Sequence, residues 1–192
     1  MHTNTLTRMV VEGTGSGING IEKDQDPQLP TVVSKWINRV IFTGTGTSGQ
    51  VPAAGCLLRH PTSTATPCIA CFDAIQPGSK NRRGCTSAAI VGGGGDGDDV
   101  EESLILIDCG PTFYSSALSH FAAQKLRKID AVLLTHAHAD AILGLDNLRS
   151  WTMGGVIQDH VDIYCTLDCF NTIKGMFPYL ADPSKSTGEY AV

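Results

Sequence analysis

Ala131-Val132-Leu133-Leu134-Thr135-His136-Ala137-His138-Ala139-Asp140-Ala141 is the most informative stretch of this sequence. Its first four residues are apolar and predict a short buried strand. Side chains two residues apart in an extended segment point to the same side, so the imidazoles of His136 and His138 can reach one metal ion, and Asp140 adds a carboxylate oxygen. Two surface histidines in a loop are the alternative. The apolar strand, the small alanine spacers and the helical pattern that follows favour the metal site.

The residues around this motif predict both strands and helices. Apolar, β-prone runs predict strands at residues 36–42, 86–91, 104–107, 131–134 and 161–165, with the glycine-rich acidic segment 92–102 as a hairpin tip. The glycine loop 44–49 lacks the lysine of a P-loop and predicts a tight turn rather than a phosphate cradle. Apolar residues near helical spacing predict helices over residues 114–126, 142–151 and 170–180. This order of elements is typical of a layered α/β sandwich.

Composition and charge narrow the class of protein. Residues 1–34 are polar and aperiodic and predict a flexible arm, followed by one domain over residues 35–182 and a polar tail at 183–192. Nineteen acidic and fourteen basic residues give a net charge of −5, and no basic run exceeds Arg82-Arg83, which disfavours nucleic acid as a partner. No apolar run reaches about 18 residues, and the first residues lack a signal-peptide core. We expect a cytoplasmic or nuclear protein without a membrane partner.

Several motifs occur in the order found in a known family. Residues 133–149 (LLTHAHADAILGLDNLR) resemble the signature of the metallo-β-lactamase superfamily, in which His-x-His-x-Asp-His follows a strand and supplies metal ligands. More narrowly, the chain resembles the bacterial phosphoribosyl cyclic phosphodiesterases of phosphonate breakdown at residues 43–52, 55–56, 68–71, 81–83 and 106–110. The resemblance implies an α/β fold of the αββα sandwich type, of which this chain supplies roughly the N-terminal half.

The same resemblance implies an activity. The protein would be a metal-dependent hydrolase with Zn²⁺ or Mn²⁺ in its active site and a small phosphodiester as its substrate. His136 and His138 would bind the first metal, and Asp140 would bind a second metal or orient the water. Asp108 would support them from the surrounding shell, so Asp140 and Asp108 are the predicted catalytic residues. A metal lowers the pKa of bound water and neutralises charge that develops on phosphorus. A β-lactam or thioester substrate, or an accessory role like that of the pyrroloquinoline-quinone relatives, is an alternative.

Two features depart from the superfamily pattern. Position 141 is alanine where a histidine usually binds the second metal, so we expect a mononuclear site. After Asp140 the sequence offers only His160 as a further histidine, whereas the family takes more ligands from its C-terminal half. We therefore expect a fragment, a truncated gene model or a splice form. These departures favour an alternative function, a catalytically silent metal-binding or interaction module.

Cysteines form a second candidate site. Their number is seven, which is odd, and without a signal peptide this favours thiols or metal ligands over disulfides. Thiolates hold zinc, and the resemblance implies a structural zinc site of Cys56, Cys68 and Cys71, with Cys85 or His60 in place of the family's late histidine. Ordinary loop cysteines or a redox pair are the alternatives. The remaining three are predicted to be buried apolar residues: Cys109, Cys165 and Cys169.

Overall fold

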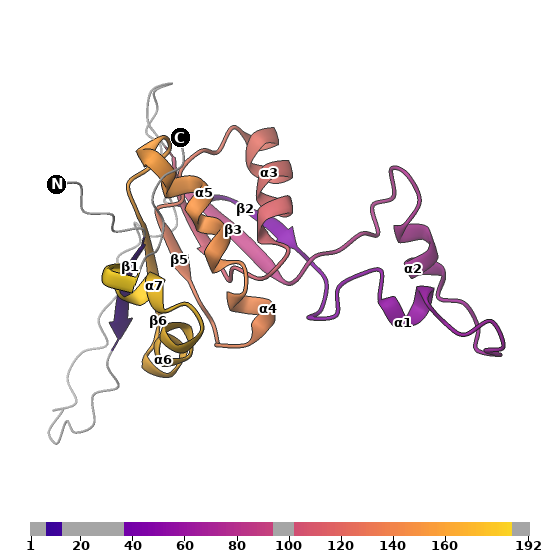
Figure 1. Cartoon of the computed structure of the whole chain (residues 1–192). Helices are drawn as coiled ribbons and strands as arrows, with labels where there is room; N and C mark the ends of the chain where they lie inside the picture. The colour runs from indigo at the N-terminus through magenta and orange to yellow at the C-terminus, as the bar shows by residue number, and fades with distance from the viewer. Residues whose placement is uncertain (1–6, 13–36, 94–101, 186–192) are drawn as a thin grey trace, which may run out of the picture.

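A single mixed β-sheet organises the protein. The computed structural model describes residues 7–12, 37–93 and 102–185. Six strands lie side by side in the order β1-β6-β5-β4-β3-β2 (Figure 1). Strands β1, β6, β5 and β4 are mutually parallel, whereas β3 is antiparallel to both β4 and β2, which confirms the predicted hairpin. Most of its predicted tip, residues 94–101, lies outside the described residues. The bounds are β1 Thr7–Glu12, β2 Ile37–Gly44, β3 Ser87–Gly92, β4 Ser103–Ile107, β5 Ala131–Leu133 and β6 Val161–Thr166.

Strand β1 corrects one sequence prediction. Residues 1–34 were expected to form a flexible arm, but Thr7–Glu12 pairs in parallel with β6, with Thr7 opposite Val161 and Glu12 opposite Thr166. The run contains Met9, Val10 and Val11, and valine favours strands. What makes it a strand is the free edge of β6. Because β6 lies about 150 residues further along the chain, the pairing leaves no periodic pattern in residues 7–12, and the sequence analysis did not predict this strand.

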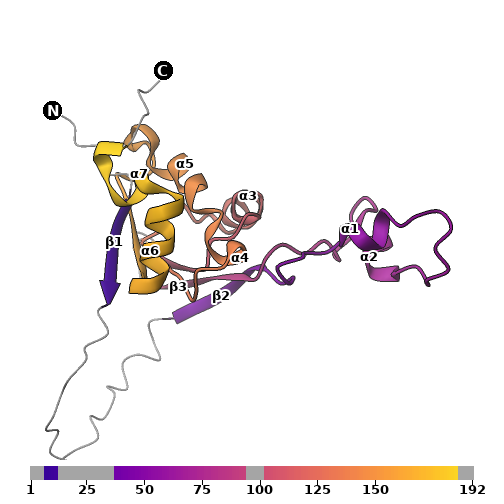
Figure 2. The ribbon, with the colours of Figure 1, turned by 60° about the horizontal axis from the view of Figure 1, so that its bottom comes forward.

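Helices cover one face of the sheet (Figure 2). The predicted helix over residues 114–126 is confirmed as α3, which ends in a left-handed residue, Lys125, with φ of 57°. No helix among the described residues is long and apolar enough to span a membrane. Helix α3 spans Phe113–Gln124. The other helices are α4 Ala139–Ile142, η2 Leu145–Leu148, α5 Arg149–Thr152, η3 Met153–Gly155, α6 Leu167–Met176, α7 Pro178–Ala181 and η4 Pro183–Lys185.

Two of the predicted helices are interrupted. The stripe over residues 142–151 is divided among α4, η2 and α5, because the backbone N–H of Gly144 donates to the carbonyl of Cys109 at 2.8 Å in a neighbouring loop. The stripe over residues 170–180 is divided between α6 and α7, because Pro178 has no N–H to continue the first helix and begins the second. The apolar periodicity identified the core-facing residues correctly, and Leu145 is fully buried.

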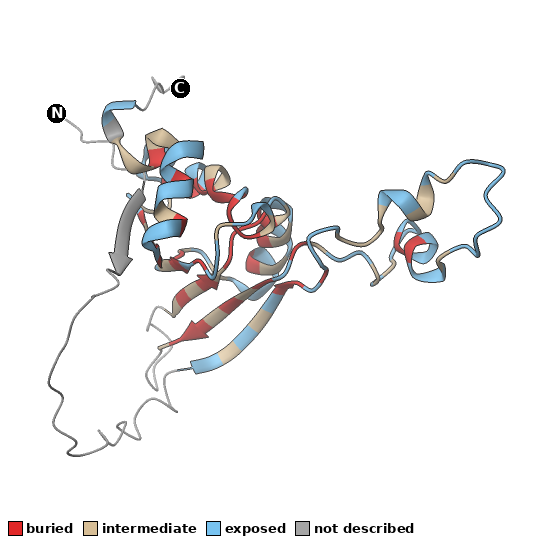
Figure 3. Ribbon diagram, turned by 90° about the horizontal axis from the view of Figure 1, so that it is seen from below, coloured by how far each residue is buried: buried red, intermediate tan, exposed pale blue. Residues whose placement is uncertain are grey.

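Burial alternates along the strands, so the two faces of the sheet differ. In β4, Leu104 and Leu106 are fully buried under the helices. The strand register places Phe42, which is 67% exposed, and Leu133, which is 44% exposed, on the opposite face. Figure 3 shows the buried and exposed bands along the strands. The α/β class is confirmed. The described residues form one sheet with one helical layer, which corresponds to half of an αββα sandwich.

Residues 52–82 form an extension that projects away from the sheet (Figures 1 and 3). It contains α1 Ala54–Leu57 and α2 Ile69–Ala74. Isolated bridges between Gly46 and Cys85 and between Val51 and Arg83 fix its root. Within the extension only Cys71 and Ala74 are buried, so it has almost no core of its own. A unit with so little buried apolar surface needs another source of stability, such as a metal.

Candidate metal centre

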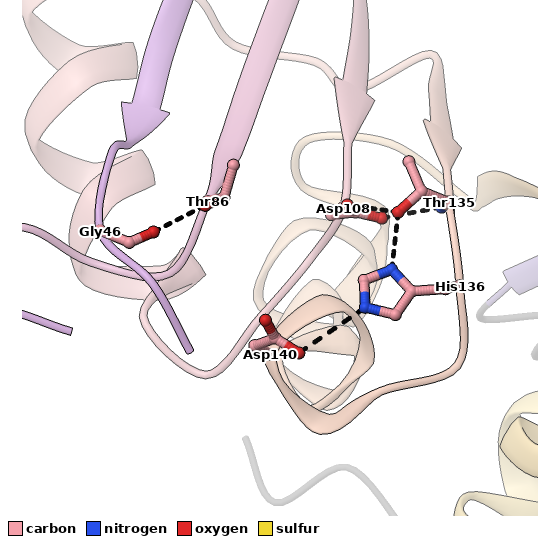
Figure 4. Close-up of polar contacts among 6 residues, drawn as sticks. All are labelled: Gly46, Thr86, Asp108, Thr135, His136 and Asp140. Atoms are coloured by element: carbon pink, nitrogen blue, oxygen red, sulfur yellow. Dashed lines mark hydrogen bonds and ion pairs between the residues drawn. The ribbon is translucent and has the colours of Figure 1, made fainter. Parts of the chain in front are cut away.

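The sheet topology brings the predicted ligands to one edge. Strands β4 and β5 are parallel neighbours, with Ile107 opposite Leu133, so their carboxyl ends lie together. Asp108 follows directly on β4, and His136 follows β5 after a turn of two residues. His138 then caps the N-terminus of α4 in an extended conformation, with φ of −74° and ψ of 156°. Figure 4 shows Asp108, Thr135, His136 and Asp140 at this edge.

The side chains of His136, His138 and Asp140 converge. One potential ligand atom from each residue lies within 4.8 Å of the other two. The imidazole rings of His136 and His138 stand almost perpendicular, at 85°, with their centroids 4.7 Å apart. Nε2 of His136 lies 3.8 Å from Oδ1 of Asp140, and the side chains of these two residues are 43% and 28% exposed. Two nitrogens and a carboxylate oxygen that face one accessible point suit Zn²⁺ or Mn²⁺. Metal binding by these residues remains a prediction.

A hydrogen-bond chain favours one tautomer of the neutral His136 ring. Both carboxylate oxygens of Asp108 accept from Thr135, Oδ1 from its backbone N–H and Oδ2 from its hydroxyl, each at 2.8 Å. The hydroxyl has a single proton, which the carboxylate takes, so its oxygen accepts from Nδ1–H of His136, also at 2.8 Å. The Nδ1–H form leaves the lone pair of Nε2 free. This arrangement suits a metal ligand, because ligating histidines commonly donate their other N–H to a fixed acceptor.

This geometry refines the role of Asp108. The sequence prediction placed it among the catalytic residues. In the structure it is only 8% exposed, and it acts on His136 through Thr135. We therefore predict that Asp108 is a positioning residue. Its own backbone is left-handed, with φ of 57°, which turns the chain sharply after β4 and aims the carboxylate at Thr135. The sequence analysis gives Thr135 no role. The signal for its role is a hydroxyl side chain directly before the first histidine of the motif.

Two glycines allow the loop after β4 to lie against α4. A Cβ atom on Gly110 would come within 1.9 Å of the carbonyl oxygen of Asp140, and one on Gly144 within 2.1 Å of the carbonyl oxygen of Gly110. The backbone N–H of Cys109 donates to the carbonyl of Ala141 at 2.7 Å. Backbone therefore meets backbone here, and only residues without a side chain fit. This contact sets the position of Asp140 relative to the loop that carries Asp108.

Comparisons with known proteins show what this chain is similar to. Residues 104–191 match the family model described as a beta-lactamase superfamily domain. A crystal structure of a diphosphatase from the PhnP family resembles the fold with a TM-score of 0.53 and 29% identity, over 73% of this chain and 46% of that chain. Residues 104–191 are therefore similar to the beta-lactamase superfamily domain, and the fold is similar to that of the PhnP-family diphosphatase. An octanoyltransferase of Porphyromonas gingivalis is 38% identical over 112 residues, which are 58% of this chain and 18% of that protein. The chain thus spans less than half the length of each of these relatives.

At position 141 the chain departs from the usual pattern of the superfamily that residues 104–191 match. Ala141 is 1% exposed and belongs to the hydrophobic core that includes Ile142 and Leu145. His160 is not part of the group of potential ligands among the described residues, and its Nε2 lies 3.9 Å from a carboxylate oxygen of Asp162 instead. A single metal ion at His136, His138 and Asp140 therefore stays our prediction for the described part of the chain.

The cysteines of the extension also converge. The Sγ atoms of Cys56, Cys68 and Cys71 lie within 4.8 Å of one another. The backbone N–H of Cys71, together with its thiol, lowers the pKa of Cys68, which favours the thiolate that zinc binds. The N–H of Ala53 donates to Cys71 Sγ at 3.4 Å and lowers the pKa of that thiol, but burial and the neighbouring thiols outweigh it, so the pKa of Cys71 is raised. Three thiols in a unit without a core support the predicted structural zinc.

Neither predicted fourth ligand joins this cluster. Cys85 is 2% exposed at the base of β3, where its Cβ lies near Gly110, and Nδ1 of His60 contacts the hydroxyl of Thr62 at 2.7 Å. Among the described residues the thiol group therefore has three members. The prediction for Cys109, Cys165 and Cys169 as buried residues is confirmed. Burial raises the pKa of Cys109 well above its ordinary value and that of Cys169 to about 11, so both remain thiols.

Proposed function

We propose that the protein is a metal-dependent hydrolase that cleaves a phosphodiester-type substrate at the His136, His138 and Asp140 cluster. The observation that carries this proposal is the hydrogen-bond chain from Asp108 through Thr135 to Nδ1 of His136, which orients the ring so that Nε2 faces Asp140. A cluster of surface histidines without a function has no need of a buried carboxylate that fixes one tautomer. The match of residues 104–191 to the superfamily model and the similar PhnP-family structure support an enzyme of the hydrolase kind.

Each residue of the cluster would have its own role in such a reaction. His136 and His138 would hold the ion through ring nitrogens, with Nε2 as the ligand of His136. A bound Zn²⁺ or Mn²⁺ supplies a nucleophilic water of lowered pKa and neutralises charge on the phosphoryl oxygens. Asp140 offers a carboxylate oxygen 3.8 Å from His136 Nε2, where it can accept the proton of that water and orient its lone pair. Asp108 keeps the proton of His136 on Nδ1 throughout, because Thr135 cannot donate to both of its partners.

The phosphodiester as substrate rests on two kinds of support. One is the similar structure, which is described as a diphosphatase from the PhnP family. The other is the set of family motifs, among them Cys56, Cys68 and Cys71, whose thiols converge in the extension. The match to the octanoyltransferase covers 18% of that protein, so acyl transfer gains no support from it.

Hydrolysis of bis-p-nitrophenyl phosphate by the whole chain tests the proposal. We expect turnover that depends on added Zn²⁺ or Mn²⁺ and falls by about 100-fold or more in His138→Ala and in Asp140→Asn. His160→Ala is the matched control, because this exposed histidine lies outside the cluster. Metal-independent turnover, or equal losses in the control and in His138→Ala, would refute the proposal.

A catalytically silent metal-binding module is the second candidate. Ala141 is buried in the core, so it offers no ligand, and the active-site cluster of the described residues has three potential ligands. Such a module would bind one metal at His136 and His138 without hydrolysing the ester. Metal content measured beside the turnover assay separates the two, since the silent module retains the metal and shows no rate.

A further inference from the structure

A polar pocket lies at the root of the extension, next to the metal centre along the same sheet edge. Its volume is about 610 Å³ and it is lined by the end of β2, by the segment that returns from the extension and by the first turns of α3. The backbone around it is firmly tied: Val51 and Arg83 exchange two hydrogen bonds of 2.9 Å, and Gly46 accepts from the Thr86 hydroxyl at 2.6 Å (Figure 4). This volume is in the range of pockets that hold small molecules.

The charge of this pocket is opposite to that of the whole chain. Arg82 and Arg83 line it, and none of its lining residues is acidic, although the protein has a net charge of −5. Both arginines are exposed, and among the described residues neither side chain has a carboxylate partner within ion-pair distance. Two arginines without an internal carboxylate partner that line one pocket are suited to an anion with several oxygens.

Helix α3 supplies the second wall with hydroxyl groups. Thr112 and Ser116 lie four residues apart, so they share one face of the helix, with Ser115 and Ser119 beside them. The Thr112 oxygen accepts from the Cys85 N–H at 2.9 Å, which leaves its own proton available for a ligand. The hydroxyl of Ser116 has no hydrogen-bond partner within the described part of the chain. Donors therefore face the pocket from both walls, which is the pattern that a phosphate requires.

We propose that this pocket binds the phosphate group of a small organic phosphate, with Arg82 and Arg83 on one side and the Thr112 and Ser116 hydroxyls on the other. The proposal goes beyond hydrolysis at the metal centre and makes no use of the metal. The glycine loop 44–49 also borders this pocket. That loop is a turn, as predicted, but Gly44 and Thr45 form part of the wall of an anion site whose positive charge comes from a different segment.

Calorimetric titration of the whole chain with AMP and with inorganic phosphate tests the proposal, with adenosine as the probe that lacks a phosphate. We expect AMP and phosphate to bind and adenosine not to bind. Arg82→Gln and Arg83→Gln should each weaken AMP binding by about 10-fold or more, since each removes a charge-assisted hydrogen bond, and Ser116→Ala by a smaller factor. Lys80→Gln is the matched control, because it removes one exposed positive charge from the same segment outside the pocket.

The same titration in His138→Ala separates this site from the metal centre. Binding of AMP that persists in His138→Ala and is lost in the arginine variants supports the proposal, whatever the outcome of the hydrolysis assay. Binding that is lost in His138→Ala places the phosphate on the metal and overturns it. Failure of both phosphate probes to bind the wild-type chain, or an equal loss of affinity in Lys80→Gln, overturns it as well. Thermal unfolding of each variant verifies that the fold is intact.

Discussion

Replacing Thr135 by valine removes one hydroxyl and tests how the metal centre is organised. The backbone N–H of residue 135 still donates to Oδ1 of Asp108, but Oδ2 loses its 2.8 Å hydrogen bond and Nδ1 of His136 loses its acceptor. Because Asp108 is only 8% exposed, the unpaired carboxylate oxygen should cost about 1–3 kcal/mol of unfolding free energy. Loss of the partner that orients a ligating histidine should weaken metal binding by about 10–100-fold, or about 1.4–2.8 kcal/mol.

Two measurements on the same samples check this prediction. Competition with a chromogenic chelator gives the metal affinity, and nitrogen NMR of the metal-free protein reports which ring nitrogen of His136 carries the proton. We expect Nδ1–H in the wild type and a loss of this preference in Thr135→Val. Thr135→Ser restores the hydroxyl and should recover most of the affinity. If Thr135→Val binds metal as tightly as the wild type and keeps the same tautomer, Asp108 does not act on His136 through Thr135.

Three further predictions follow from packing and from the pKa shifts. Gly110→Ala should destabilise the protein by about 3 kcal/mol or more in urea unfolding, because its Cβ would meet backbone at 1.9 Å. Gly175→Ala is the control, because Gly175 has open space around it in α6, and it should be neutral or stabilising by up to about 1 kcal/mol. Equal effects of the two substitutions would contradict the close contact at Gly110. Burial and the hydrogen bond to Asp146 raise the pKa of Tyr179 from 10.0 to about 12. The stability that its neutral hydroxyl contributes should therefore be present below pH 10 and lost as the pH rises through about 12. In unfolding measured against pH, the difference in stability between Tyr179→Phe and the wild type should disappear over that range. In the metal-free protein, iodoacetamide should label Cys68, whose pKa is lowered, and should leave Cys109 unlabelled until the chain unfolds. Mass spectrometry of digests measures the labelling of each cysteine. Labelling of Cys109 in the folded protein would argue against its burial.

Features with a short range along the chain could be predicted from the sequence. The hairpin of β3 and β4 and helix α3 were anticipated because strands and helices impose their own periods on neighbouring residues. The convergence of His136, His138 and Asp140 was anticipated for the same reason, since all three lie within five residues around a strand end. Where a distant partner intervened, the predictions were wrong. Strand β1 depends on the edge of β6, and the helix predicted at 142–151 is broken where Gly144 meets another loop.

The sequence by itself thus determined the class of the fold and the residues of the candidate metal centre, because both depend on local spacing along the chain. The tertiary structure decided which hydrogen bonds orient the side chains of those residues. Parallel pairing of β4 with β5 brings Asp108 to Thr135 from 27 positions away, and this contact sets the tautomer of His136. The pocket between Arg82, Arg83 and α3 likewise exists only because the root of the extension folds back on the helix. Neither arrangement follows from periodicity, since each joins segments that only the sheet places side by side.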